Sequence, residues 1–368
     1  MAANLYVHFP FCRSRCSYCS LYSRAISTAA EREQYIESIR VELESLRVRL
    51  SSTLTDPNPT LKTLYFGGGS PALCDLMPLK CALAPLLDEN TEFTVELHPL
   101  DVTSAKLDEL KSIGVNRISM GVQSLDDDIL RAMGRGYTAS DAARAFALVK
   151  QRFDNAGIDL IIGYPGERGT GNGERRTGLS SLKSWGLVHC SAYSLQNERG
   201  LKDVPDDDIV LDRIRAVAAF LKNLGLERYE ISNYARPGFE CRHNFAVWRG
   251  EDYIGLGEGA YGREGLKRTR GILQNSVNGE QEEGKGKSGE NLLIAYKTTE
   301  VTPSEDLKER TLFRLRTRDG IDSSQFPEWR PTLDRLVTEG LLVKIDESVY
   351  RLTERGTEVC DAILEELV

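Results

Sequence analysis

The stretch HFPFCRSRCSYCSLYS, residues 8–23, holds three cysteines, Cys12, Cys16 and Cys19, in the spacing C-x₃-C-x₂-C. Thiolates are soft metal ligands, and no fourth cysteine follows nearby. A closed structural zinc site takes four ligands, and a disulfide framework takes an even number of cysteines. The stretch therefore favours a [4Fe–4S] cluster in which one iron is left for a ligand other than the protein.

Two other interpretations of these cysteines stay open. The thiols could be neighbours with no common ligand, or they could hold zinc together with His8 or a distant cysteine. Aromatic neighbours favour the cluster, because Phe9, Phe11 and Tyr18 would exclude water from it. The other cysteines are widely spaced and are expected to be small core or surface residues: Cys74, Cys81, Cys190, Cys241 and Cys360.

Composition limits the class of protein. The 368 residues carry a net charge of −8, which argues against a nucleic-acid partner held by a broad basic surface. No apolar run approaches the roughly 20 residues of a membrane span. The residues ahead of Leu5 resemble neither a secretory signal nor a transit segment. Eight cysteines are too few for a disulfide scaffold of this length. We expect a soluble cytoplasmic protein.

Short β-rich runs alternate with helical patterns along most of the chain. Strands are expected at 5–9, 63–69, 92–99, 117–124, 157–166 and 189–196, and helices at about 29–50, 103–113, 127–133, 139–153, 175–185 and 207–225. The first helix should bury Tyr35, Ile36, Ile39, Val41, Leu43 and Leu46. Such alternation implies right-handed crossovers and a parallel sheet. We predict an α/β fold, a partial TIM-type barrel of about six strands with its site at their C-terminal ends.

The composition changes after the last of these units. Residues 275–290 are polar, glycine-rich and without periodicity, which indicates a flexible loop. Beyond it we expect helices at 304–317, 332–340 and 354–367 and a hairpin at 341–353, a winged-helix-like α+β arrangement. The predicted division is a barrel domain at 1–265, a linker at 266–300 and a C-terminal domain at 301–368. Because winged-helix domains can bind DNA, the pattern indicates a DNA-binding regulator as one alternative function.

A glycine motif, GGGSP at 67–71, follows the second expected strand. Consecutive glycines let a backbone approach a ligand closely, and exposed N–H groups can hold a carboxylate. An ordinary turn is the alternative for this motif taken alone.

With these features in order, the sequence resembles the radical S-adenosylmethionine (SAM) superfamily. Within it, the chain is most similar to the HemW-type heme chaperones of the coproporphyrinogen III oxidase-like branch. The resemblance covers about residues 4–262 and rests on LYVHFPFCRSRCSYC, YFGGGSPALC, TVELHP, RISMGVQSLDDDILRAMGR, IDLIIGYPG, HCSAYSL, RYEISNYARPGFECRHNFAVWRG and YIGLGEGA. The C-terminal part also resembles the corresponding part of that family.

The resemblance implies a set of ligand-binding residues. Cys12, Cys16 and Cys19 would ligate a [4Fe–4S] cluster whose open iron is chelated by SAM, and reductive cleavage of SAM yields a 5′-deoxyadenosyl radical. The positions implied to bind SAM are Tyr6, Tyr18, Gly68, Gly69, Ser70, Glu96, Gln123, Arg135 and Asp159. The glycine motif would meet the amino-acid end of SAM through its backbone N–H groups.

Some of these residues have other possible roles. Glu96 and Asp159 could be solvated carboxylates at strand ends, and Arg135 could cap a helix or pair with 126–128. Tyr18 could shield the cluster without contacting SAM.

Sequence differences at a few positions distinguish the decarboxylating enzyme of this branch from the chaperones. The decarboxylating enzyme keeps a fourth cysteine where this chain has Leu21, and it has an extension before its first strand. Chaperone members carry H-N-x-x-Y-W, which is linked to heme, and this chain has His243-Asn244-Phe245-Ala246-Val247-Trp248. His243 is therefore a candidate heme ligand, although Val247 replaces the tyrosine and a histidine next to an asparagine is often structural. Ser70 replaces a threonine, and His98 in ELHP has no clear role.

The expected function is that of a heme chaperone. It would bind a [4Fe–4S] cluster and SAM, carry heme as cargo, and pass it to acceptor hemoproteins, with membrane-associated respiratory proteins as one class. The alternative is an oxygen-independent coproporphyrinogen III dehydrogenase of porphyrin biosynthesis, against which Leu21 argues. No catalytic residue is assigned, and no nucleic acid is expected as a partner.

Overall fold

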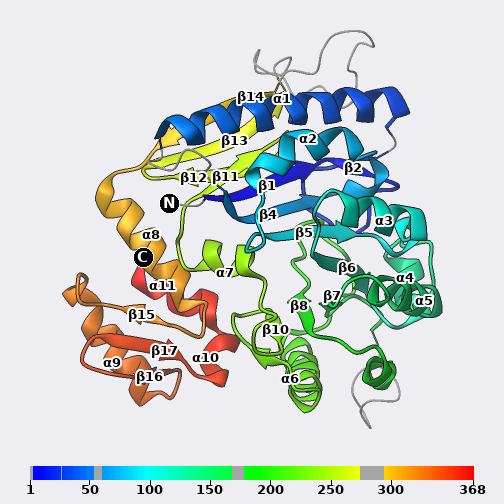
Figure 1. The fold of residues 1–368 in the computed structure, drawn as a ribbon. Coiled ribbons are helices and arrows are strands. Elements are labelled where there is room, and N and C mark those ends of the chain that lie inside the picture. The colour runs from blue at the N-terminus through cyan, green and yellow to red at the C-terminus, as the bar shows by residue number, and fades with distance from the viewer. Residues whose placement is uncertain (1–2, 26, 54–59, 168–177, 274–293) are drawn as a thin grey trace.

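The computed structural model describes residues 3–25, 27–53, 60–167, 178–273 and 294–368. Its centre is a curved twelve-stranded sheet, shown in Figure 1, in the order β14-β13-β12-β11-β1-β4-β5-β6-β7-β8-β10-β9. Six successive parallel strands confirm the expected units: β1 (Ala3–Phe9), β4 (Leu61–Gly68), β5 (Glu92–Leu97), β6 (Arg117–Gln123), β7 (Asn155–Ile162) and β8 (His189–Ser194). β14 and β9 form the two edges, so the sheet is a partial barrel.

Among the described residues, six further strands extend the sheet and two more close the first loop. β11 (Tyr253–Leu256) runs parallel to β1, and β12 (Tyr261–Glu264), β13 (Lys267–Leu273) and β14 (Ile294–Glu300) follow antiparallel. β10 (Asn233–Ala235) and β9 (Glu227–Arg228) complete the other edge. Two short strands, β2 (Phe11–Cys12) and β3 (Arg24–Ala25), pair with each other outside this sheet.

The prediction of a linker at 266–300 is wrong at both ends of that range. Residues 267–273 form β13 and residues 294–300 form β14, and the two strands pair with each other. Charged residues such as Arg268 and Arg270 hide the strand pattern of β13, and strands near a sheet edge tolerate them well. The polar stretch 275–290 lies outside the described residues.

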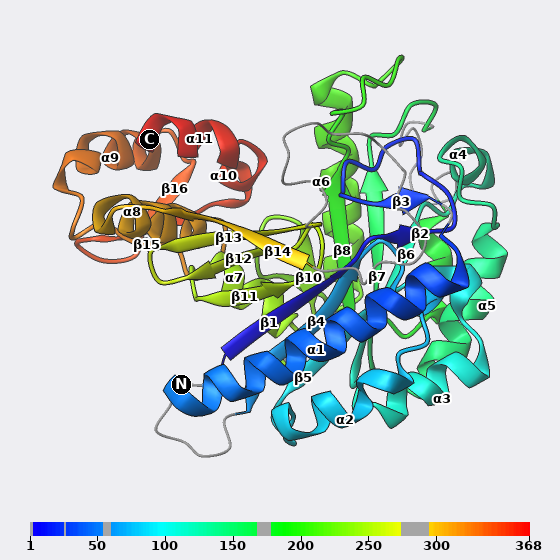
Figure 2. The same ribbon diagram turned by 90° about the horizontal axis from the view of Figure 1, so that it is seen from above.

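Helices cover the outer face of the sheet, where Figure 2 shows α1, α2, α3 and α5 following its curve. The helices of the barrel are α1 (Ala29–Thr53), α2 (Lys80–Leu83), α3 (Ser104–Ser112), α4 (Asp127–Ala132), α5 (Ala139–Lys150), α6 (Asp207–Asn223) and α7 (Arg242–Trp248). α5 begins with a capping box between Thr138 and Asp141. None of the helices in the described ranges is both long and apolar enough to cross a membrane.

Two helix expectations need correction. Residues 175–177 lie outside the described part, and the rest of the helix expected at 175–185 is a 3₁₀ helix, Leu179–Ser184. Val41 on α1 is 51 % exposed, whereas the other five expected core residues of that helix are buried. Val41 sits away from the stripe that the 3.6-residue period directs at the sheet.

Strand alternation sorts the side chains of the barrel into two environments. Val7, Phe66, Val95 and Met120 are fully buried on the helix side. Their sequence neighbours face the barrel interior, and these neighbours are polar: Tyr6, Tyr65, Glu96 and Ser119. The period of two thus supplies an apolar core outside the barrel and a polar interior that opens at the strand ends.

The C-terminal part has its own small sheet and its own core. It contains α8 (Pro303–Leu315), β15 (Ile321–Asp322), α9 (Arg330–Thr338), β16 (Leu342–Lys344), β17 (Val349–Leu352), α10 (Glu354–Glu358) and α11 (Cys360–Leu367). The strands form a sheet in the order β15-β17-β16, in which β16 and β17 are antiparallel neighbours. Leu315, Leu333, Tyr350 and Ile363 belong to an apolar cluster separate from the barrel core. This cluster supports a domain boundary near residue 301, which we retain as a proposal.

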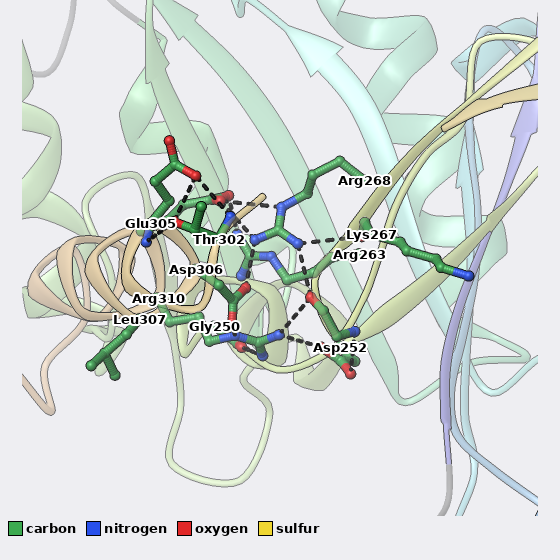
Figure 3. Close-up of polar contacts among 12 residues, drawn as sticks. Gly250, Asp252, Arg263, Lys267, Arg268, Thr302, Glu305, Asp306, Leu307 and Arg310 are labelled. Atoms are coloured by element: carbon green, nitrogen blue, oxygen red, sulfur yellow. Dashed lines mark hydrogen bonds and ion pairs between the residues drawn. The ribbon is translucent and has the colours of Figure 1, made fainter. Parts of the chain in front are cut away.

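An ionic network fastens α8 to the sheet edge, and Figure 3 shows its side chains. Arg268 Nη2 lies 2.6 Å from Asp306 Oδ1 and 2.8 Å from Glu309 Oε2. Arg310 bonds Asp306 Oδ2 at 2.7 Å and Asp252 Oδ1 at 2.6 Å. Buried Arg263 also pairs with Glu309. The network joins α8 to β12, β13 and the loop before β11.

Replacing Arg268 with alanine should lower the free energy of unfolding by about 1–2 kcal/mol, because two partly buried carboxylates lose a shared partner. Urea denaturation measures the change. Arg40→Ala is the control, since its partners Glu37 and Glu44 are exposed and a solvent-screened pair adds little stability. Equal losses in both variants would show that the network adds no more than surface pairs do.

Candidate functional site

The three cysteines lie on a loop at the C-terminal end of β1. β2 leads into the loop and β3 returns from it, with Phe11 opposite Arg24 and Cys12 opposite Ala25. The backbone N–H of Arg24 also donates to the carbonyl of Pro10 at 2.5 Å. The loop is thus closed at its base and lies where the parallel strands end.

The donor chemistry of the loop suits an iron–sulfur cluster. All three thiols are half-buried and free. Burial raises the pKa of Cys12 to about 11 and also raises the pKa of Cys19, and the neighbouring cysteines add to both shifts. Within the described ranges, no three His, Cys, Asp or Glu side chains are arranged so that they could hold a metal ion. The three cysteines nevertheless lie near enough for Cys16 to raise the pKa of both Cys12 and Cys19, and cluster binding would bring their sulfurs closer together.

Arg135 brings a buried positive charge to this loop. Its Nη1 donates to Cys16 Sγ at 3.4 Å and to Tyr18 Oη at 3.3 Å. Its Nη2 donates to the carbonyl of Gly121 at 2.9 Å. Pairing with residues 126–128 was the alternative, but these contacts point the guanidinium at the cysteine loop. A cation here favours thiolates over thiols.

The glycine motif supports the cysteine loop through its N–H groups. Gly69 N donates to Phe9 O and Ser70 N to Phe11 O, both at 2.7 Å, and Gly68 N donates to Glu96 Oε2 at 3.1 Å. This corrects the expectation that these donors meet the amino-acid end of a ligand, because the protein already uses them.

The hydroxyl of the motif is also engaged. Ser70 Oγ donates to Asp101 Oδ2 at 2.5 Å, and Asp101 in turn accepts from Arg13 Nε at 2.6 Å. Arg13 follows Cys12 directly. Ser70 therefore acts through Asp101 on the start of the cysteine loop.

Replacing Gly69 with alanine should displace the strand that leads into Cys12. An added Cβ would lie 2.4 Å from Phe11 O and 2.8 Å from Phe9 O, so backbone must move, at a cost of about 1–3 kcal/mol. Gly238→Ala is the control, because its Cβ meets nothing within 4 Å and only its φ of +87° is strained. Both variants should lose stability in urea, but only Gly69→Ala should lower iron content after reconstitution. Equal iron content would contradict this role.

The carboxyl groups of Glu96 and Asp159 both lie inside the barrel, near enough for the charge of Asp159 to act on Glu96. Glu96 Oε1 accepts from Tyr65 Oη at 2.8 Å, and Asp159 Oδ1 accepts from Ser119 Oγ at 3.0 Å. Burial, and then the charge of Asp159, raises the pKa of Glu96 to about 7. Burial raises the pKa of Asp159 as well. These carboxylates are bonded within the barrel rather than solvated, and a positively charged ligand would relieve their repulsion.

The remaining expected SAM positions are Tyr6, Tyr18 and Gln123. Tyr6 Oη is 2.9 Å from His8 Nδ1, and the ring of Tyr18 meets that of Tyr164 edge-on at 6.5 Å. Gln123 ends β6 with a positive φ of 66° and folds its amide over Gly121. Of the nine positions, Tyr6 lies in the middle of β1 and Asp159 in the middle of β7. Tyr18 and Arg135 lie at the cysteine loop, and the others lie at or near the ends of β4, β5 and β6. Their roles remain predictions.

His243 occupies a different place. It lies on α7 with 4 % of the residue exposed, and its Nδ1 is 2.8 Å from Thr63 Oγ1. Its ring is 6.2 Å from Tyr6 and 5.2 Å from Tyr65. Burial, and then Arg117, lowers its pKa to about 3. The imidazole is neutral and faces the barrel interior rather than the surface.

The other end of α7 meets the C-terminal part. The ring of Trp248 is 5.6 Å from Phe313, and Arg316 lies over it at 4.9 Å. The segment His243 to Trp248 therefore bridges the barrel interior and α8.

Sequence reasoning missed several residues that contact the loop. Tyr22 and Arg24 both bond Glu258, and Arg199 Nε donates to Cys19 O at 2.6 Å. Glu258 lies in YIGLGEGA, a motif that signals the family without revealing this contact. His98 accepts from Leu100 N at 3.2 Å and so caps the short turn after β5.

Comparisons with known proteins agree with the resemblance. The family described as the radical SAM superfamily matches residues 6–169. The heme chaperone HemW of Bacillus subtilis strain 168 is 29 % identical over 99 % of this chain and 100 % of its own length. HemW of Lactococcus lactis subsp. lactis strain IL1403 is 32 % identical over 70 % of this chain and 69 % of its own.

One solved structure supports the fold. Coproporphyrinogen III oxidase, HemN, from Escherichia coli superposes with a TM-score of 0.79, covering 100 % of this chain and 90 % of that one. At 21 % identity this likeness establishes the architecture alone.

Proposed function

Because the chain belongs to the HemW family of the radical SAM superfamily, we propose that it is a heme chaperone that binds a [4Fe–4S] cluster and SAM. It would carry heme and pass it to acceptor hemoproteins. The observation that supports this most directly is the cysteine loop at the strand ends, with the Arg135 guanidinium 3.4 Å from Cys16 Sγ. Heme is proposed as the cargo because the similar proteins are named heme chaperones.

Cys12, Cys16 and Cys19 would hold the cluster, and when bound the cluster supplies the electron for SAM cleavage. Arg135 offsets the negative charge of the thiolates, and Tyr18 limits the access of water to them. The glycine motif and Asp101 fix the entry strand of the loop. These residues set the loop's position and charge before any ligand arrives.

SAM would bind beside this loop through the interior carboxylates. Its sulfonium and ammonium groups are positive, and Glu96 and Asp159 offer a matching negative site. Tyr6, Gln123 and the carbonyl oxygens of the glycine motif would orient the rest of the molecule.

The hydrogen bonds around His243 favour the tautomer that a heme iron requires. Thr63 Oγ1 donates to Asn4 Oδ1 at 3.0 Å, and Asn4 Nδ2 donates to Asp252 O at 3.0 Å. The Thr63 hydroxyl can therefore only accept from His243, which places the proton on Nδ1 and leaves Nε2 with its lone pair. We propose His243 as the heme ligand, in a state in which α7 has moved outward from its buried position.

The function is tested by measuring heme binding and coproporphyrinogen III turnover on one anaerobically reconstituted preparation. A heme chaperone should give a heme-dependent absorbance band and no protoporphyrinogen. Turnover with SAM consumption would establish the dehydrogenase alternative instead. Absence of heme binding in a preparation with an intact cluster would refute the proposal.

We also propose the cytoplasm as the compartment, with acceptor hemoproteins, membrane-associated respiratory ones included, as partners. All eight cysteines are free thiols, which fits a reducing environment.

A further inference from the structure

One buried carboxylate holds the segment that follows Cys19. Tyr22 donates its hydroxyl to Glu258 Oε1, and Arg24 donates Nη2 to Oε2 of the same group. The side chain of Glu258 is 4 % exposed, whereas that of Arg24 is 31 % exposed. Burial raises the pKa of Tyr22 to about 12, so the hydroxyl stays a donor. Both carboxylate oxygens are therefore bonded to the return arm of the cysteine loop.

Glu258 is itself fixed by the barrel. Its backbone N–H donates to Tyr35 Oη at 3.2 Å, and Tyr35 donates its hydroxyl to the carbonyl of His8. The next residue, Gly259, has a φ of +87°, and a Cβ there would lie 2.6 Å from the ring of Tyr22. The loop between β11 and β12 thus packs directly on Tyr22 and has little freedom to shift.

The return arm also makes hydrogen bonds through its backbone: Arg24 N donates to Pro10 O at 2.5 Å, and Cys19 O accepts from Arg199 Nε at 2.6 Å. β3 is two residues long and pairs only with β2, and a ladder this short is marginal by itself. His8 Nε2 donates to the carbonyl of Tyr22 at 2.8 Å, which adds one contact on the barrel side. The bonds to Glu258 are the buried, charge-assisted ones, and bonds of that kind are the stronger class.

We infer that Glu258 is a positioning residue that holds the three cysteines in place for cluster binding. The inference rests on the proposed cluster site, since Glu258 acts on Cys12, Cys16 and Cys19 only through Tyr22 and Arg24. Fixing the base of a loop before its ligand arrives removes conformational freedom that binding would otherwise have to remove.

A purely structural role for Glu258 makes a different prediction. If the Arg24 pair merely stabilised the loop between β11 and β12, its removal would lower the melting temperature and leave the cysteines as they are. The reactivity of the thiols in the cluster-free chain therefore separates the two roles.

The experiment is thiol alkylation of the full-length, cluster-free chain by iodoacetamide, followed residue by residue by mass spectrometry at one fixed pH. Exposed Cys81 is the internal reference. Glu258→Ala should speed alkylation of the loop thiols by about tenfold relative to Cys81, as expected for loss of a charged hydrogen bond. Glu258→Gln keeps an acceptor for Tyr22 and should give a smaller increase. Iron retained after reconstitution should fall in the same order.

Glu309→Ala is the matched control, because it also removes a carboxylate partner of buried arginine, but on α8. It should lower the melting temperature without changing the alkylation rates. Unchanged rates in folded Glu258→Ala would overturn the inference. If that variant does not fold, Glu258→Gln and Tyr22→Phe decide, and unchanged rates in both have the same consequence. Alkylation needs no cluster, SAM or heme, so its outcome is independent of whether the proposed function holds.

Discussion

The Cys16→Ser variant is expected to hold no iron–sulfur cluster after anaerobic reconstitution and to lose SAM binding with it. A serine hydroxyl stays protonated near neutral pH and is a harder ligand than a thiolate, so it is a poor substitute. Cys16 also accepts from Arg135 Nη1 at 3.4 Å, and its loss removes the sulfur that this cation faces. Iron and sulfide content, visible absorbance and calorimetric titration with SAM measure the effect.

The control for this loss is Cys81→Ser, since Cys81 is exposed and lies far along the chain from the loop. It should retain cluster and SAM binding at wild-type levels. If Cys16→Ser kept a full cluster, another residue would have to be the third ligand, and the proposed cluster site would be wrong.

SAM affinity is expected to rise as the pH rises through about 7 and to level off above it. The pKa of Glu96 is raised to about 7 from its ordinary 4.5, mainly by burial, so in the ligand-free barrel this carboxyl is protonated below pH 7. A cationic ligand prefers the ionised form, and its affinity should therefore fall by up to about tenfold per pH unit below that value. Glu96→Gln should bind SAM more weakly and with little pH dependence.

The free energy of unfolding of the ligand-free protein should change in the opposite direction and fall as the pH rises. A carboxyl whose folded pKa lies above its unfolded value destabilises the fold as pH rises from about 4.5 to about 7, and the penalty is constant above that. Urea denaturation of wild type and Glu96→Gln across this range measures the difference. A wild-type affinity that does not change with pH would contradict the assignment of Glu96 to the cation site.

The six parallel strands could be predicted because their apolar residues alternate with polar ones that face the interior. Val7 and Phe66 are both fully buried on the helix side, and their polar neighbours Tyr6 and Tyr65 mark the interior face. β13, which lies next to the edge strand β14, could not be predicted in this way, because its arginines resemble loop residues. Local patterns thus identify strands with one buried apolar face and miss charged strands near a sheet edge.

The sequence predicts which residues form the site better than it predicts the hydrogen bonds that those residues make. The place of Glu96, one residue before the end of β5, follows from chain order, since parallel strands end together. Asp159 lies in the middle of β7 rather than at its expected end. The partners of Ser70 N and Gly69 N are carbonyls of the cysteine strand, and no sequence pattern encodes that pairing. The contact between Tyr22 and Glu258 joins residues 236 positions apart and is visible only once the fold is known.

The helix α7 makes the barrel interior mechanically sensitive to the C-terminal part. Its seven residues span about 10 Å at the rise of an α-helix. His243 near its start and Trp248 at its end are thus held at a fixed separation by one short helix. Trp248 rests on Phe313 and Arg316, and His243 rests on Thr63. We therefore expect a tilt of α8 against the sheet to displace the imidazole inside the barrel.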